Sequence, residues 1–223
     1  MNPQEALVLD FGGVLYAIDY DAPVRAFAAL GATGFDQIYH KAAQQPLLDA
    51  LETGQLSEAE FLSALASHCA PGTSLAAVAA AWNSILIGLQ PWTRAAIPLL
   101  ARSYRLILFS NTNALHARAF TSELTDSGDW ALFTTHFEAL HFSHELGMRK
   151  PHPEAFLHLC ALHQLDPART RFIDDSLQHV EGARAAGLKA KHLVELTEQG
   201  FYAAVKDLGE AAHEQGGGAA GVA

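Results

Sequence analysis

The chain has 223 residues, with 14 basic and 24 acidic side chains and a formal net charge of −10 at pH 7. Half of its residues are hydrophobic and 17% are charged, a balance that excludes a disordered chain and allows one sizeable core with a small insertion. The negative charge disfavours sequence-independent binding to nucleic acid, because such binding depends on Lys and Arg that displace counterions from phosphates.

Residues 6–10 (ALVLD) form a short apolar run that ends in an aspartate. This pattern predicts a buried strand whose last side chain emerges at the carboxyl end. Two glycines, Gly12 and Gly13, follow shortly after Asp10 and would let a ligand approach the backbone closely. The segment does not fit a signal peptide, because no basic leader precedes the apolar run and Asp10 lies within it.

Residues 17–90 contain no comparable β-rich run and instead have the patterns of consecutive helices. These patterns cover residues 22–30, 36–54, 57–69 and 74–89. Ser57 followed by Glu60 fits a capping box at the start of the third helix. An all-helical block inserted after the first strand predicts a cap over the site that the remaining segments form.

From Pro91 onwards the chain alternates between strand and helix patterns. Apolar runs at 105–111 and 170–175 predict two further buried strands that end in polar residues. Helical patterns cover residues 93–103, 153–165 and 177–187, and Gly187 fits a C-terminal cap. Such alternation predicts a parallel α/β sheet, in which ligands bind beyond the carboxyl ends of the strands. The three polar strand endings therefore indicate one site.

These patterns divide the chain into three parts. Residues 1–16 and 91–208 form the predicted core domain, residues 17–90 the helical cap, and the Gly/Ala-rich residues 209–223 a flexible C-terminal tail. No stretch reaches the ~18 consecutive apolar residues that a membrane span needs. Because two cysteines give no disulfide framework, we expect a cytoplasmic protein, monomeric or homodimeric, without a membrane or nucleic-acid partner.

Carboxylates gather at the predicted strand ends. Asp10 ends the first strand, and Asp174 and Asp175 end the third. Carboxylates that meet at one sheet edge would repel each other by about 4 kcal/mol per pair at 4 Å and an effective dielectric constant of 20. A divalent cation removes that repulsion, and hard oxygen ligands favour Mg²⁺. Taken singly, each aspartate also fits an ordinary turn or helix cap.

Two further segments supply groups that suit a phosphate. The tetrapeptide Ser110-Asn111-Thr112-Asn113 lies between an apolar run and a helical pattern, where hydroxyls and free backbone N–H groups can bind an anion. Lys150 precedes two prolines that restrict the backbone around its ammonium group. Each segment alone also has an ordinary interpretation, as a helix start or as a surface lysine. No zinc-type spacing of Cys and His is present.

Four segments resemble, in order and spacing, the four motifs of the haloacid dehalogenase (HAD) superfamily: DFGGVL at 10–15, FSNTN at 109–113, GMRKPHPEAF at 147–156 and FIDDSLQHVEGARAAG at 172–187. The resemblance spans nearly the whole chain. It is strongest to the C1-capped members, in particular the alpha-D-glucose-1-phosphate phosphatases and the phosphatase domain of soluble epoxide hydrolase. It implies an α/β fold with a Rossmann-like parallel sheet core, helices on both faces and an inserted all-helical cap.

The resemblance also implies a Mg²⁺-dependent phosphatase of a small phosphorylated metabolite, with a sugar phosphate such as glucose 1-phosphate as the leading substrate. By position, Asp10 is the expected nucleophile that forms an aspartyl-phosphate, Ser110 holds the phosphoryl group, and Lys150 neutralises its charge and orients the nucleophile. The expected Mg²⁺ ligands are Asp10, the Gly12 carbonyl, Asp174 and Asp175. The expected substrate contacts are Gly12, Gly13, Asn111, Thr112, Tyr39 and His40.

Two positions depart from the family pattern. Phosphatases of the superfamily usually have a second Asp two residues after the nucleophile as the general acid, and Gly12 stands there. General acid–base catalysis contributes ~10²–10⁴-fold, so the chain needs a substitute donor, a leaving group that needs little protonation, or a slower reaction. The residues weighed as substitutes are Tyr16, Asp19, Tyr39 and His40. His179 stands where many members have Asp or Asn.

Other functions stay open at this point. A 2-haloacid dehalogenase uses the same Asp without a metal, so activity retained in EDTA would favour it. A non-catalytic protein that binds a phosphorylated ligand or partner would show binding without turnover. A phosphotransferase such as a mutase would return the phosphoryl group to the sugar. Substrate choice is expected to lie in the cap, at Tyr39, His40, Lys41, Gln44, Trp82 and Asn83.

Overall fold

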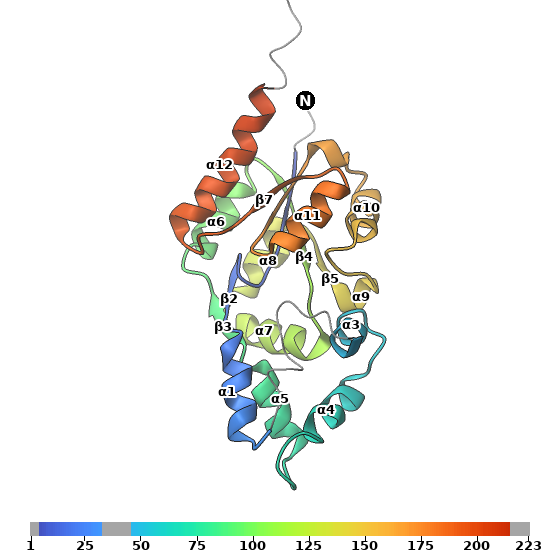
Figure 1. Ribbon diagram of the computed structural model, residues 1–223. Helices are drawn as coiled ribbons and strands as arrows, with labels where there is room; N and C mark the ends of the chain where they lie inside the picture. Colours follow the sequence, from blue (N-terminus) through green and yellow to red (C-terminus); the bar gives the residue numbers. More distant parts are fainter. Residues whose placement is uncertain (1–4, 33–45, 215–223) are drawn as a thin grey trace, which may run out of the picture.

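The computed structural model describes residues 5–32 and 46–214, with side chains as far as Leu208. Five parallel strands form the main sheet in the order β5-β4-β1-β6-β7 (Figure 1). The strands are β1 (Ala6–Leu9), β4 (Arg105–Ser110), β5 (Phe137–Phe142), β6 (Thr170–Asp174) and β7 (Lys189–His192). The predicted strands at 6–10, 105–111 and 170–175 are confirmed, and they are the three central strands.

Helices cover both faces of this sheet, and the alternation of side chains along β1 explains why. Leu7 and Leu9 belong to an apolar cluster on one face, whereas Val8 belongs to a separate cluster on the other. The first face is covered by α6 (Thr93–Leu100), α7 (Ala114–Asp126), α8 (Trp130–His136) and α12 (Glu198–Glu214). The second is covered by α10 (Pro153–Leu162) and α11 (Leu177–Ala185). Burial on both faces explains why β1 and positions 106–109 of β4 are apolar, whereas β6 also buries Thr170 and Arg171.

The two outer strands were missed by the sequence analysis. β5 reads FEALHF and β7 reads KAKH, so charged and polar residues interrupt both. They lie at the edges of the sheet, where charged side chains are common because they prevent pairing with another chain. Two short connecting elements complete the sheet domain, α9 (Ser143–Leu146) and η1 (Pro167–Arg169).

The helices that precede β3 pack around an apolar cluster of their own. They are α1 (Asp21–Ala29), α3 (Pro46–Glu52), α4 (Glu58–Ala66) and α5 (Leu75–Asn83), and in Figure 1 they lie below the sheet. Their cluster includes Phe27, Phe61 and Trp82. The predicted capping box is confirmed, since Glu60 N donates to Ser57 Oγ at 3.3 Å and Ser57 N to the Glu60 carboxylate at 3.1 Å.

The prediction that this block is entirely helical is wrong at its two ends. β2 (Tyr16–Ile18) and β3 (Leu86–Leu89) pair antiparallel in a separate two-stranded sheet. The pattern 74–89 predicted one helix through β3, but Gly88 has φ = 142°, which lies outside helical geometry. The chain therefore enters and leaves the cap helices through two adjacent strands.

The C-terminal helix is longer than the sequence analysis predicted. α12 continues through Glu214 and so includes the first six residues of the predicted tail, 209–214. The residues in that stretch include two alanines and two glutamates, which favour helix and extend α12. Among the helices of the described ranges, none combines the length and hydropathy needed to cross a bilayer.

Candidate active site

The central strands bring the polar endings of three distant segments to one edge of the sheet. Leu9 of β1 is in register with Leu108 of β4 and with Ile173 of β6. This register places Asp10 level with Asp174 and one residue before Ser110 at the carboxyl ends, and the Asp10 backbone N donates to Ile173 O at 3.0 Å. The predicted convergence of these residues is thus present in the structure.

Lys150 lies inside this cluster and is completely buried. Its Nζ donates to Asp10 Oδ1 at 2.7 Å and to Asp174 Oδ2 at 2.6 Å. The rings of Phe109 and Phe172 lie 5.5 and 5.4 Å from the same atom. Burial alone would lower the pKa of Lys150, but the two carboxylates raise it above its ordinary value, so the ammonium group stays charged.

Asn111 and Thr112 make contacts that organise the site. The Asn111 side chain donates from Nδ2 to Lys150 O at 2.8 Å, and its Oδ1 accepts from Lys150 N at 3.0 Å. Thr112 N donates to Ser143 Oγ at 3.0 Å, and Ser143 Oγ donates to Thr112 O at 3.0 Å. Both residues line the cavity described below. The Asn111 side chain, however, binds the backbone of Lys150 and so positions it, and the Thr112 backbone N–H is already bonded to Ser143.

Three carboxylates form a group that suits a hard cation. One oxygen each of Asp10, Asp174 and Asp175 lies within 4.8 Å of the others. Burial and the charge of Asp174 raise the pKa of Asp10, while Lys150 opposes them. Burial also opposes ionisation of Asp174, but Lys150 and His179 hold its pKa at about 2. This all-oxygen donor set beside a charged lysine fits Mg²⁺.

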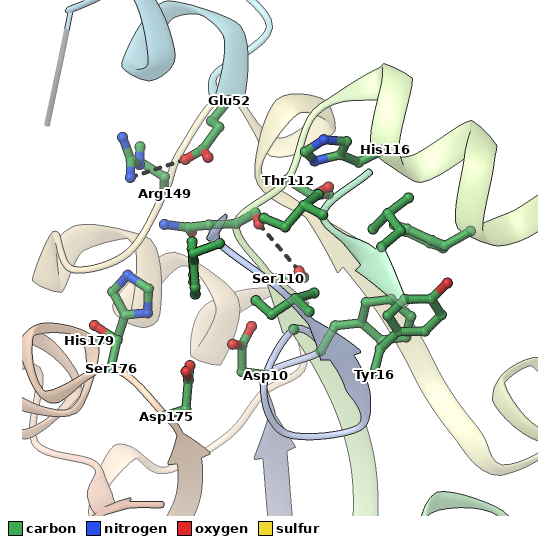
Figure 2. A pocket seen from close by; sticks show the side chains of 18 of the residues that line it. Asp10, Tyr16, Glu52, Ser110, Thr112, His116, Arg149, Asp175, Ser176 and His179 are labelled. Carbon is green, nitrogen blue, oxygen red and sulfur yellow. Dashed lines mark hydrogen bonds and ion pairs between the residues drawn. The ribbon is translucent and has the colours of Figure 1, made fainter. Parts of the chain in front are cut away.

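The two members of the Asp174-Asp175 pair have different surroundings. Asp174 is fully buried, and its oxygens accept from Lys150 Nζ and, at 2.8 Å, from Ser176 N. His179, which stands where many family members have Asp or Asn, places its Nδ1 3.0 Å from both Asp174 oxygens and so contacts this carboxylate. Asp175 instead lines the cavity (Figure 2). Asp174 therefore anchors the lysine, and Asp175 is the more accessible carboxylate.

The glycines after Asp10 create room beside these carboxylates. A Cβ on Gly13 would lie 2.5 Å from Asp175 Cγ, and Gly13 has φ = 81°, a conformation that favours glycine. A Cβ on Gly12 would lie 3.2 Å from Cδ1 of Ile18 in β2, so the Ile18 side chain limits the space at that position. Gly12 lines the cavity.

A cavity of about 190 Å³ separates this cluster from the cap helices. The carboxyl ends of the sheet contribute Asp10 and Ser110, and the cap contributes Glu52 of α3 and Trp82 of α5. Ser110 Oγ has a long contact of 3.4 Å to Asn111 O, which leaves the hydroxyl able to turn towards a ligand. Figure 2 shows Glu52 on the far side of the cavity from Asp10.

Glu52, Arg149 and His116 are among the cavity residues that sequence reasoning missed. The Arg149 guanidinium forms ion pairs with Asp49 and, at 3.0 Å, with Glu52, and so joins the core loop to α3. The His116 ring stacks on Trp82 with centroids 4.9 Å apart, and burial lowers the pKa of His116 to about 4. Arg149 lies inside a recognised motif, but no sequence signal marks Glu52 or His116.

The residues weighed as substitute acids have poor surroundings for that role or lie elsewhere. The Tyr16 hydroxyl donates to the Glu123 carboxylate, and burial raises the pKa of Tyr16. Asp19 is bonded to Arg25, which lowers the pKa of Asp19. The other residues named for the cap, Tyr39, His40, Lys41 and Gln44, lie outside the described residues. Asn83 is at the end of α5 and is not among the residues that line the cavity.

Gly182 of α11 permits close packing against the loop that carries Lys150. A Cβ at this position would lie 1.9 Å from the carbonyl oxygen of Pro151. We expect Gly182→Ala to cost ~1–3 kcal/mol through overpacking, although alanine is the better helix former. Thermal unfolding should show a fall of about 2–4 °C per kcal/mol. Glu181→Ala, on the exposed face of the same helix, is the control, and an equal melting temperature for both variants would contradict the packing argument.

Comparison with known proteins agrees with this geometry. A family model described as haloacid dehalogenase-like hydrolase matches residues 4–187. The chain is 30% identical to D-ribitol-5-phosphate phosphatase of Bacteroides thetaiotaomicron over 184 residues, which are 82% of this chain and 88% of that protein.

Solved structures of similar proteins extend the comparison. One is a HAD family enzyme from Bacteroides thetaiotaomicron, an aspartate-to-alanine mutant in complex with magnesium and inorganic phosphate, with a TM-score of 0.75 and 26% identity. That match covers 84% of this chain and 93% of the other. Another, a Porphyromonas gingivalis protein described as a predicted HAD-like family hydrolase, has a TM-score of 0.75 and 26% identity over 92% of this chain and 98% of its own.

Proposed function

This chain belongs to the haloacid dehalogenase-like hydrolases, and from this premise we propose that it is a Mg²⁺-dependent phosphatase of small sugar or polyol phosphates. The observation that carries the proposal is the buried Lys150 ammonium group, which bridges Asp10 and Asp174 beside the cavity. The relative that hydrolyses D-ribitol 5-phosphate favours phosphorylated polyols and sugars as a class. Glucose 1-phosphate is one member of that class and has no specific support over the others.

Asp10 is the proposed nucleophile. Its Oδ1 is held by Lys150 Nζ at 2.7 Å, which orients the carboxylate and leaves its other oxygen to attack phosphorus. The P–O bond to the leaving group breaks as the aspartyl-phosphate forms, and water then releases inorganic phosphate and restores Asp10. Lys150 also places a positive charge where phosphoryl oxygens would lie, and the Ser110 hydroxyl can donate to one of them.

A magnesium ion would be held by Asp10, Asp175 and the Gly12 carbonyl, with Asp174 beside them. When bound, it supplies positive charge that neutralises the phosphoryl oxygens. Three clustered carboxylates favour this metal-dependent chemistry over a 2-haloacid dehalogenase, whose reaction needs no cation. Asn111 and His179 are proposed to position Lys150 and Asp174 respectively, as their contacts indicate.

We expect Mg²⁺-dependent release of inorganic phosphate from one or more members of a panel of sugar and polyol phosphates. The panel includes ribitol 5-phosphate, glucose 1-phosphate and other small phosphomonoesters, each assayed with Mg²⁺ and with EDTA. EDTA is expected to remove nearly all activity, because the positive charge that the cation would supply to the phosphoryl oxygens is then missing. Release that persists in EDTA, or binding of phosphorylated ligands without any release, would contradict the proposal.

A further inference from the structure

The proposed reaction lacks a proton donor at the position where related phosphatases usually have one. Gly12 has no side chain, yet a sugar or polyol leaves as a strongly basic alkoxide unless it is protonated. Tyr16 and Asp19 have pKa values shifted away from those of useful donors, and His116 is neutral at physiological pH. Among residues 5–32 and 46–208, the other side chains that line the cavity are therefore the candidates for the donor.

Glu52 has the position that this donor requires. It is the last residue of α3, it lines the cavity, and Figure 2 shows its carboxyl group on the opposite side from Asp10. In phosphoryl transfer the attacking and leaving oxygens are roughly in line, so a leaving group displaced by Asp10 departs towards the cap. Within the described part of the chain, Glu52 Oε2 is buried and makes no hydrogen bond, although Arg149 Nη2 is 3.0 Å away.

The surroundings of Glu52 also suit an acid that gains and loses a proton near neutral pH. Burial raises the pKa of Glu52 to about 7, and the positive charge of Lys150 opposes this rise. The charged groups that face Glu52 are Arg149 and Lys150 from the core loop, with Asp49 on its own helix. Arg149, whose Nη2 lies 3.0 Å from Glu52 Oε2, can stabilise the carboxylate that remains after the proton leaves.

We propose that Glu52 is the general acid of this site and protonates the leaving oxygen of the substrate. This inference rests on the proposed phosphatase function. As the bond from Asp10 to phosphorus forms, the P–O bond to the leaving group breaks, and its electron pair takes the proton from Glu52. The products of this step are the free alcohol, the aspartyl-phosphate and the Glu52 carboxylate. In the second step the carboxylate takes a proton from the attacking water, which restores Glu52 as inorganic phosphate leaves.

The test compares leaving groups of different basicity in the Glu52→Gln variant. For a polyol or sugar phosphate turned over by the wild type, kcat/KM is expected to fall ~10²–10³-fold, because the amide cannot donate the proton. For p-nitrophenyl phosphate, whose leaving group is stable without a proton, kcat/KM is expected to stay within about threefold. The ratio kcat/KM is the chosen readout because it reports steps up to formation of the aspartyl-phosphate and excludes its hydrolysis.

Asp49→Asn is the matched control. Asp49 lies one turn before Glu52 in α3 and also pairs with the Arg149 guanidinium, but it does not line the cavity that contains Asp10. Its replacement weakens the link to Arg149 and leaves the carboxyl group of Glu52, so kcat/KM should fall equally little for both substrates. Thermal unfolding of both variants establishes that each is folded, and Glu52→Asp, which keeps an acid on a shorter side chain, should recover part of the loss.

Three results would overturn the assignment. They are an unchanged kcat/KM of Glu52→Gln for the polyol or sugar phosphate, equal losses for both substrates, and the same selective loss in Asp49→Asn. Equal losses would mean that Glu52 acts as a structural link between cap and core. These outcomes differ from failure of the proposed function, in which the wild type itself releases phosphate from no substrate.

Discussion

Asp10→Asn is expected to abolish phosphate release, with a fall of at least ~10⁴-fold in kcat. The amide has nearly the same volume as the carboxylate and its oxygen can still accept from Lys150 Nζ, but it cannot form the aspartyl-phosphate. The variant also removes one negative charge from a group of three close carboxylates, so the protein should be at least as stable without metal as the wild type. Phosphate release and thermal unfolding measure the two effects.

Asp19→Asn is the control for this experiment. Asp19 lies near the start of the cap, is bonded to Arg25 and is partly exposed to solvent. Its replacement removes the same charge from the chain and should leave kcat within about twofold, because ion pairs at the surface contribute little. Turnover by Asp10→Asn at the rate of the wild type would rule out Asp10 as the nucleophile.

Lys150→Met is expected to remove activity and to cost ~3–5 kcal/mol of the free energy of unfolding. Removing one partner of a buried ion pair leaves uncompensated charge, and here two carboxylates lose their shared ammonium group. Methionine has a similar length and packs well beside Phe109 and Phe172, so the loss reflects charge more than volume. Denaturant unfolding without metal, together with phosphate release in Mg²⁺, measures both effects.

Lys191→Met provides the comparison for the loss of a lysine. Lys191 pairs with Asp207 at the surface, where its side chain is 39% exposed, and ion pairs of this kind contribute ~0–1 kcal/mol. A second comparison adds Asp174→Asn to Lys150→Met, which removes one of the two stranded charges and should recover part of the lost stability. If Lys150→Met were no less stable than Lys191→Met, the buried charge cluster would not be what the lysine stabilises.

The central sheet and the reacting groups were predictable because their signals are local. β1 and the centre of β4 are apolar because both faces are buried, β6 carries the apolar pair Phe172-Ile173, and each strand leads to a polar residue at the edge where ligands bind. Lys150 was predictable from its motif, but its complete burial between two carboxylates was not. The edge strands β5 and β7 were not predictable because charged residues interrupt them, and in the two-stranded sheet β3 contains Gly88 and β2 has only three residues.

The sequence by itself determined which strands end in polar residues, where the helices are inserted, and which residue types can perform phosphoryl transfer. Only the tertiary structure decided which cap residues lie opposite those polar strand ends. The spacing of apolar residues predicts a helix around Glu52, but it does not reveal which segment packs against the last turn of that helix. Glu52 reaches the cavity because α3 packs against the loop that contains Arg149. The pKa of Glu52 likewise follows from burial by segments far away in the chain. Proton affinity and access to a substrate are properties of surroundings, and packing between the cap and the core creates those surroundings.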